Sequence, residues 1–128
     1  IYTLSLHDAL PIFTNINLTV PQDSLFRAMP PAFLASALAE GLPKQISGYK
    51  VVKDGFDTNK NGVEIGFVEA SYTVKNARGQ NTTVYQKLVI FEIKGGTAMM
   101  TFTTPLDLKS LTLPIFDSIT DTIKPLKK

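Results

Sequence analysis

The chain has 128 residues, no cysteine and a formal net charge of +2 at pH 7. This length corresponds to one domain that can bury most of its apolar surface without covalent cross-links. The absence of cysteine excludes disulfides and thiolate metal sites. The small, dispersed basic excess argues against nucleic-acid binding, which requires a basic face interleaved with aromatic residues. No run of about 18 apolar residues follows Phe13, so we expect no transmembrane segment.

Residues 1–12 read IYTLSLHDALPI and resemble the in-frame translation of a common sequencing adapter. On this interpretation they are a non-native segment, and residues 13–128 form a single domain. The only histidine, His7, lies in the non-native segment, so the domain has no His, Cys or Trp. Without Asp8 the chain carries 13 basic and 10 acidic residues, a net charge of +3. The interpretation leaves room for a signal peptide or lipid anchor lost upstream.

The first predicted element of the domain is a short strand over residues 13–20. Phe13, Ile16 or Leu18, and Val20 alternate there with Asn and Thr before Pro21. Alternation of this kind is typical of a strand with one buried face.

A helix is predicted next, over residues 32–40. Pro30 and Pro31 open it, because a residue in the first helical turn needs no N–H. Gly41 and Pro43 are expected to end it. The expected apolar face consists of Phe33, Leu34, Ala37 and Leu38.

Beyond Gln45 the apolar period changes to two, which indicates strands. Four runs are predicted, at residues 49–56, 63–74, 82–94 and 97–104. The segments between them are rich in Asn and Gly, which accept the positive φ that hairpin turns require. The four runs therefore predict an antiparallel meander.

The third of these runs is apolar on both sides. Val84, Leu88 and Ile90 point one way, and Tyr85, Val89, Phe91 and Ile93 point the other. We therefore expect both faces of the sheet to be covered over part of its length. In the fourth run Met99 and Met100 should face opposite sides as core residues.

After Pro105 the apolar residues return to helical spacing and predict an amphipathic helix that lies on the sheet and ends at Pro125. Its expected apolar stripe is Leu111, Ile115, Phe116, Ile119 and Ile123. The predicted fold class is therefore α+β, with about five antiparallel strands, an N-terminal helix and a C-terminal helix.

Residues 57–62 match the first half of an EF-hand calcium loop, D-x-N-x-N-G. The second half fails, since Val68 stands where a bidentate Glu is needed and no helix follows. A hairpin turn with Asn61-Gly62 at its tip explains the same residues, and we favour the turn.

Acid–base or nucleophilic catalysis in this domain would rely on carboxylates or lysines. The serines have no G-x-S-x-G or S-x-x-K setting. Glu64 and Glu69 lie five apart in one strand and hence on opposite faces, although Asp54 or Glu92 could approach either one. Glu69 is the candidate for a partly buried acid, with a structural pairing to lysine as the favoured interpretation. We expect no catalytic, cofactor-binding or metal-binding residues, no cofactor and no enzymatic activity.

The closing part of the chain resembles the PsbP-like α/β sandwich family, which includes DcrB-like bacterial lipoproteins. The likeness is carried by residues 95–105, GGTAMMTFTTP, and by residues 113–124, LPIFDSITDTIK. With the meander it covers roughly residues 51–124. The N-terminal third departs from the family pattern, since it offers Phe26 where an aromatic residue, often Trp, is usual.

This resemblance implies a non-enzymatic accessory domain, extracytoplasmic or lipid-anchored in bacteria, with an unknown protein partner. The alternative is a carrier of a small apolar ligand held between the sheet and the C-terminal helix. A pocket lined by Phe91, Met100, Phe102 and Phe116 would favour the carrier, and dense packing of those side chains would favour the accessory domain.

A shortened chain that begins at Phe13 is expected to melt within a few degrees of the 128-residue chain, because residues without evolved contacts contribute little to a core. Thermal unfolding followed by circular dichroism measures this. A large drop in melting temperature would show that residues 1–12 belong to the fold.

Overall fold

The computed structural model describes residues 2–5, 14–21, 26, 28–75 and 78–126, and only the backbone of residues 2–5. The elements in chain order are β1 (Tyr2–Ser5), β2 (Asn15–Thr19), α2 (Pro31–Gln45), β3 (Lys50–Thr58), β4 (Glu64–Lys75), β5 (Asn81–Ile93), β6 (Gly96–Pro105), the 3-10 turn η1 (Leu106–Leu108) and α3 (Lys109–Thr120).

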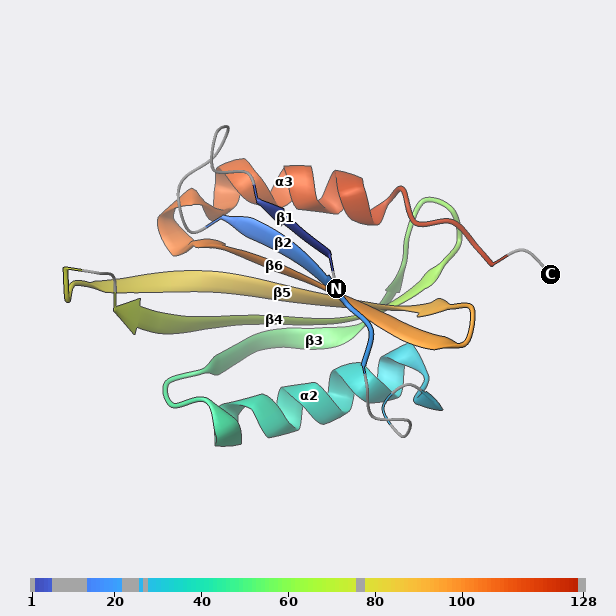
Figure 1. Cartoon of the computed structure of the whole chain (residues 1–128), viewed down its shortest axis with the longest axis horizontal. Coiled ribbons are helices and arrows are strands. Elements are labelled where there is room, and N and C mark those ends of the chain that lie inside the picture. The colour runs from blue at the N-terminus through green and yellow to red at the C-terminus, as the bar shows by residue number, and fades with distance from the viewer. Residues whose placement is uncertain (1, 6–13, 22–25, 27, 76–77, 127–128) are drawn as a thin grey trace.

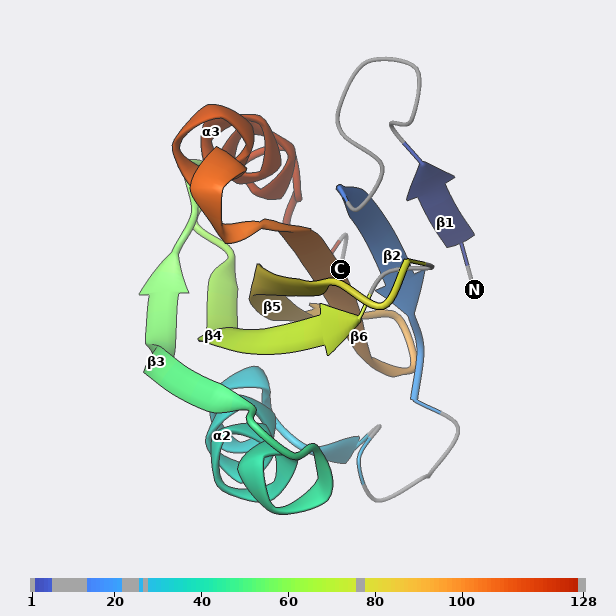
Figure 2. The same ribbon diagram turned by 90° about the vertical axis from the view of Figure 1, so that its left-hand side faces the viewer.

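The strands of the described residues form one antiparallel sheet of six, in the order β1-β2-β6-β5-β4-β3. Strands β3 to β6 are the predicted meander, and β2 joins it by pairing with β6 (Figure 1). The sheet lies between α2 on one face and α3 on the other (Figure 2). The predicted α+β class is thus confirmed, with one strand more than the five expected.

The additional strand is β1, which comes from the segment interpreted as non-native. Its backbone pairs antiparallel with β2, from Tyr2 opposite Leu18 to Ser5 opposite Asn15. It is extended and occupies an edge of the sheet. Residues 1 and 6–13, including Phe13 of the predicted first strand, lie outside the described residues. The origin of residues 1–12 therefore stays a prediction.

Strand β5 is covered on both faces, as predicted from its sequence. Leu88 and Ile90 belong to the core cluster under α2, and Val89 and Phe91 belong to the cluster under α3. All four have exposed fractions of 9% or less. Met100 is buried in the α3 cluster, and Met99 packs against the α2 cluster, so the two methionines do face opposite sides.

Helix α2 is longer than predicted, and its buried face is rotated. Gly41 and Pro43 lie inside it, and its last N–H bond runs from Ile46 to the Leu42 carbonyl. Phe33, expected to be buried, is 70% exposed. The side chains that face the sheet are Leu34, Ala35, Leu38, Ala39 and Leu42. Packing of Leu38 and Leu42 holds the last turn in place, which overrides the local tendency of Gly and Pro to end a helix.

The start of α2 lies directly on strand β4. A Cβ atom at Gly66 would clash with the Pro31 carbonyl. The missing side chain at Gly66 therefore allows the helix to approach the sheet closely enough to bury Ala35.

Helix α3 lies on the sheet as expected, but its predicted stripe is partly wrong. Leu111 is 68% exposed and Ile115 is 42% exposed. Phe116 and Thr112 are buried instead, and partly buried Leu113, Ile119 and Ile123 pack beside them. The helix ends at Thr120 rather than Pro125.

Two contacts determine how α3 is rotated on the sheet. The Phe116 ring stacks on Phe102 of β6, with centroids 4.5 Å apart and planes 9° apart. The Thr112 hydroxyl bonds the Thr104 hydroxyl at 3.0 Å, and Thr104 in turn bonds Thr14 at 2.9 Å. All three threonines are buried and need these partners, since an unpaired buried hydroxyl is costly. A helix turned to bury Leu111 and Ile115 would lose both contacts.

We expect Phe116→Ala to reduce the free energy of unfolding by about 3–5 kcal/mol, because it removes a fully buried ring and leaves a cavity. The matched control is Leu111→Ala on the exposed side of the same helix, which should change stability little. Urea denaturation of both variants measures the difference. An unchanged midpoint for Phe116→Ala would mean that α3 does not close the core.

Candidate functional site

A groove of about 300 Å³ lies on the α3 face of the sheet. Its floor comes from the edge strand β3 and from β4 and β5, and its wall comes from the last turns of α3. We call it the α3 groove. Its charged lining residues are Lys53, Asp57, Glu69, Lys87, Asp117 and Asp121.

The groove exists because α3 is anchored over β6 and does not extend over β3 and β4. The Phe102–Phe116 stack holds the helix at β6, two strands away from β4. The α3-facing positions of β3 include Lys53, Gly55 and Asp57, which are polar or lack a side chain. These positions can be exposed to solvent at little cost, so no apolar layer is required to cover them.

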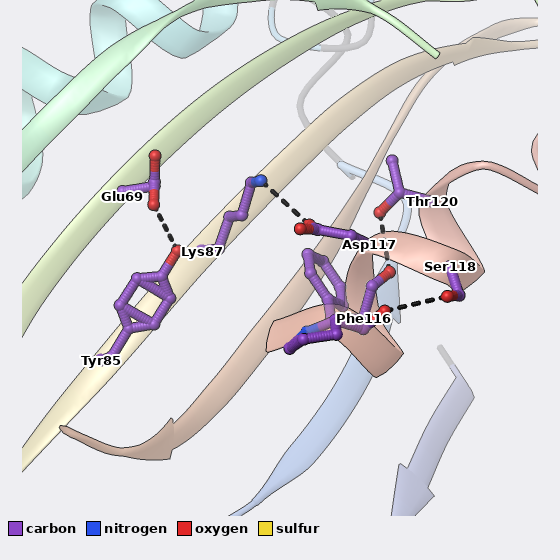
Figure 3. Close-up of polar contacts among 8 residues, drawn as sticks. Glu69, Tyr85, Lys87, Phe116, Asp117, Ser118 and Thr120 are labelled. Carbon is purple, nitrogen blue, oxygen red and sulfur yellow. Dashed lines mark hydrogen bonds and ion pairs between the residues drawn. The ribbon is translucent and has the colours of Figure 1, made fainter. Parts of the chain in front are cut away.

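A row of alternating charges crosses the groove. In the sheet register Lys53 lies opposite Glu69, and Glu69 lies opposite Lys87. The Lys87 ammonium then forms an ion pair with Asp117 of α3, with Nζ 3.3 Å from Oδ1 (Figure 3). Opposite charges on neighbouring strands stabilise a sheet, so this row joins the sheet to the helix.

Glu69 has a tyrosine as its hydrogen-bond partner, not the lysine that we predicted. The Tyr85 hydroxyl donates to Glu69 Oε1 at 2.5 Å (Figure 3). The Glu69 side chain is half-buried rather than enclosed. Burial and the adjacent Glu69 carboxylate raise the pKa of Tyr85 well above its usual value. Tyr85 therefore stays protonated near neutral pH and acts as a hydrogen-bond donor.

Phe67 forms the apolar part of the floor. The ammonium groups of Lys53 and Lys87 each lie 5.7 Å from the centroid of its ring. Cations are attracted to an aromatic face at this distance. Opposite Phe67 in the register is Gly55, so no side chain from the edge strand covers the ring from that position.

The loop between β3 and β4 is the predicted hairpin turn, and it also holds the end of α3. Asn59 Oδ1 accepts the N–H groups of Asn61 and Val63. Asn59 Nδ2 donates to the carbonyls of Thr120 and Ile123, at 3.0 and 2.8 Å. The Asn61 amide donates to the Asp121 and Ile123 carbonyls. The loop side chains thus satisfy carbonyls that a helix end leaves unpaired.

These bonds explain why residues 57–62 match half of a calcium loop. Asn59 uses both its oxygen and its nitrogen within the fold, so its oxygen has two N–H donors rather than a metal as its partner. Among the described residues no group of three or more His, Cys, Asp or Glu is placed to hold a metal ion.

The other acidic candidates lie away from the α3 groove. Glu64 lines two hollows on the opposite face of the sheet, near Pro31, and Glu92 lines both of them as well. Glu64 and Glu69 thus face opposite sides, as predicted. Asp54 lies opposite Val68 in the register, and Val68 belongs to the α2 cluster, so Asp54 is also on the other side.

The four side chains proposed to line a carrier pocket fill the core instead. Phe102 and Phe116 are fully buried, and Phe91 and Met100 have exposed fractions of 9% and 7%. None of them lines the α3 groove or any of three further hollows in the described residues. The sequence reasoning missed Lys53, Lys87, Asp117 and Tyr85. Only the position of Lys87 opposite Glu69 could have been predicted from the sequence, because it follows from the register of the β4–β5 hairpin.

Within the described ranges, no helix is long and apolar enough to cross a membrane. No family model and no curated protein matches the chain. The fold is an α+β sandwich that solved structures share. Crystal structures of two such proteins align with it over most of its length.

The first is PA94 of Pseudomonas aeruginosa, a protein of unknown function suggested to be a regulator. It has a TM-score of 0.55 and 18% identity, and the alignment covers 99% of this chain and 98% of that chain. The second is LpqN of Mycobacterium tuberculosis, which is involved in cell envelope biogenesis. It has a TM-score of 0.51 and 21% identity, with 91% of this chain and 67% of that chain covered. Identities this low show a shared fold only.

Millimolar calcium is expected to leave the melting temperature unchanged, because a ligand raises stability only when the native state binds it. Asp57→Ala should show the same lack of response. Thermal unfolding with calcium or with a chelator measures this. A saturable rise in melting temperature that Asp57→Ala abolishes would contradict the hairpin-turn interpretation.

Proposed function

We propose that this protein is a non-enzymatic, extracytoplasmic accessory domain of the PsbP-like and DcrB-like type that binds a protein partner through the α3 groove. The observation that carries the proposal is the groove itself. It is an open, charged surface whose floor contains a partly buried aromatic ring, Phe67, beside a buried apolar core.

The fold supports this assignment at the level of architecture. The order of strand, helix, four-stranded meander and terminal helix is the one that the PsbP-like resemblance implies. The structural likeness to LpqN, which is involved in cell envelope biogenesis, is compatible with a place outside the cytoplasm. An export signal or lipid anchor upstream of residue 13 is part of the proposal.

The chemistry of the groove favours binding over catalysis. Two of its carboxylates are engaged with other side chains: Tyr85 donates to Glu69, and Lys87 pairs with Asp117. A general acid or base works best with a pKa near the operating pH, and Tyr85 is shifted away from that range.

The charge balance of the groove disfavours nucleic acid as a partner. Asp57, Glu69, Asp117 and Asp121 outnumber Lys53 and Lys87 in the lining. Phosphate groups bind where lysine and arginine predominate.

A photo-reactive amino acid at position 53 should cross-link a discrete protein partner in cells that produce the protein from its complete gene, because Lys53 lies in the groove. The control is the same substitution at Lys44, in the last turn of α2. Fractionation of the same cells should recover the protein outside the cytoplasm. Equal cross-linking from both positions, or cytoplasmic recovery, would contradict the proposal.

A further inference from the structure

We infer that the outer edge of strand β3 pairs with the same edge of a second copy of this chain, antiparallel and centred on Gly55. Three features of the described residues support this dimer: an uncovered sheet edge, a self-complementary pattern of charges and an exposed aromatic side chain. The dimer does not depend on the proposed function of the α3 groove.

Strand β3 has β4 on one side and no described strand on the other. It is the last strand in the sheet order, and it lies outermost on its side of the molecule (Figure 2). The N–H and C=O groups that an edge strand turns outward can pair with another strand. The bulge of β3 lies between Val51 and Lys53, and from Lys53 to Thr58 every residue is in register with β4. This regular stretch is therefore open to a further strand.

The two faces of β3 restrict how two copies can pair. Lys53, Gly55 and Asp57 lie on the α3 face, and Asp54 and Phe56 lie on the α2 face. Residues directly opposite each other in an antiparallel pair point to the same face. Two identical stretches related by a two-fold axis can therefore pair only in registers centred on a single residue.

Among these registers, the one centred on Gly55 brings opposite charges together. Lys53 of each copy then lies opposite Asp57 of the other copy, so that two equivalent ion pairs can form. A register centred on Lys53, on Asp54 or on Asp57 places that charged residue opposite its own counterpart, which is unfavourable. A register centred on Phe56 forms no pair of opposite charges. The charge pattern of the strand thus favours a second copy as the occupant and also selects the register.

The same register brings two exposed aromatic rings together on the α2 face. Phe56 is 66% exposed. With Gly55 at the centre, the two Phe56 side chains are diagonal neighbours across the two-fold axis, a separation that aromatic rings can span. Their contact removes apolar surface from water. The two Asp54 carboxylates lie on the other diagonal and repel each other, so we expect a dimer that dissociates on dilution.

Pairing through β3 joins the two α3 grooves. The two-fold axis is perpendicular to the sheet, so both α3 helices lie on the same side of the enlarged sheet. Strand β3 contributes the outer part of each groove floor. The floors of the two grooves therefore become continuous, with one α3 helix as the wall at either end. A partner that binds in the groove meets two copies of the site on one face.

Sedimentation velocity of the full chain over a wide range of concentrations measures the assembly. We expect a monomer–dimer equilibrium that added salt shifts toward the monomer. Lys53→Asp and Asp57→Lys should each weaken the dimer by about tenfold, because each change turns two opposite-charge pairs into two like-charge pairs. The combined variant restores both pairs with their charges exchanged and should restore the dimer. Lys44→Asp, which reverses an exposed lysine on α2, is the matched control and should have no effect.

Carbodiimide treatment tests the register, since this reagent couples a carboxylate only to an amine in contact with it. We expect a covalent dimer in which Lys53 is joined to Asp57, identified by mass spectrometry of its peptides. Within one chain these residues lie four positions apart on an extended strand, about 13 Å at 3.3 Å per residue. A Lys53–Asp57 product therefore comes from two copies.

A chain that stays monomeric at every concentration overturns the inference. A dimer that both charge reversals leave intact, or that the combined variant fails to restore, also overturns it. Cooperative unfolding of each variant near the melting temperature of the unmodified chain confirms that it is folded. The mass of the product cross-linked from position 53 keeps the proposed function separate. A product of twice the chain mass is the dimer, whereas a product with a different protein is the partner complex, and either can be absent without the other.

Discussion

The burial of strand β5 on both faces is the constraint on which the rest of the structure depends. Val84, Leu88 and Ile90 face one side, while Tyr85, Val89 and Phe91 face the other. Each large apolar side chain left in water would cost about 1.5–3 kcal/mol, so neither face can stay open. The meander cannot cover itself. The chain therefore supplies one helix before the meander and one after it, on opposite sides (Figure 2).

The two helices do not cover their faces equally, and the groove follows from this difference. Helix α2 packs on β3, β4 and β5, so it reaches as far as the edge strand β3. Helix α3 has 12 residues and is held over β6 by Phe116 and Thr112. The sequence of β3 and β4 matches this arrangement, since Lys53, Asp57 and Glu69 stand on the face that α3 leaves open.

The strands could be predicted from the sequence because their period of two and their Asn- and Gly-containing turns are local signals. The rotation of the helices could not. In the sequence, the apolar stripes that contain Phe33 and Leu111 are as regular as the stripes whose residues are buried in the structure. What selects Phe116 is its stack on Phe102, and such a contact depends on distant residues. The site was predicted only at Glu69, since its partner Tyr85 and the Lys87–Asp117 pair depend on register and on the placement of α3.

The loop of residues 57–62 shows how one sequence pattern can serve a role other than the one it resembles. Asn residues in a calcium loop present oxygens to a metal, whereas Asn59 and Asn61 present nitrogens to the carbonyls at the end of α3. Asparagine suits this role because its amide donates without carrying charge. A lysine in the same place would bond the carbonyls and also neutralise Asp57 and Asp121. The choice of a neutral cap therefore keeps this end of the groove electronegative, and it ties the position of α3 to the hairpin that forms the other wall.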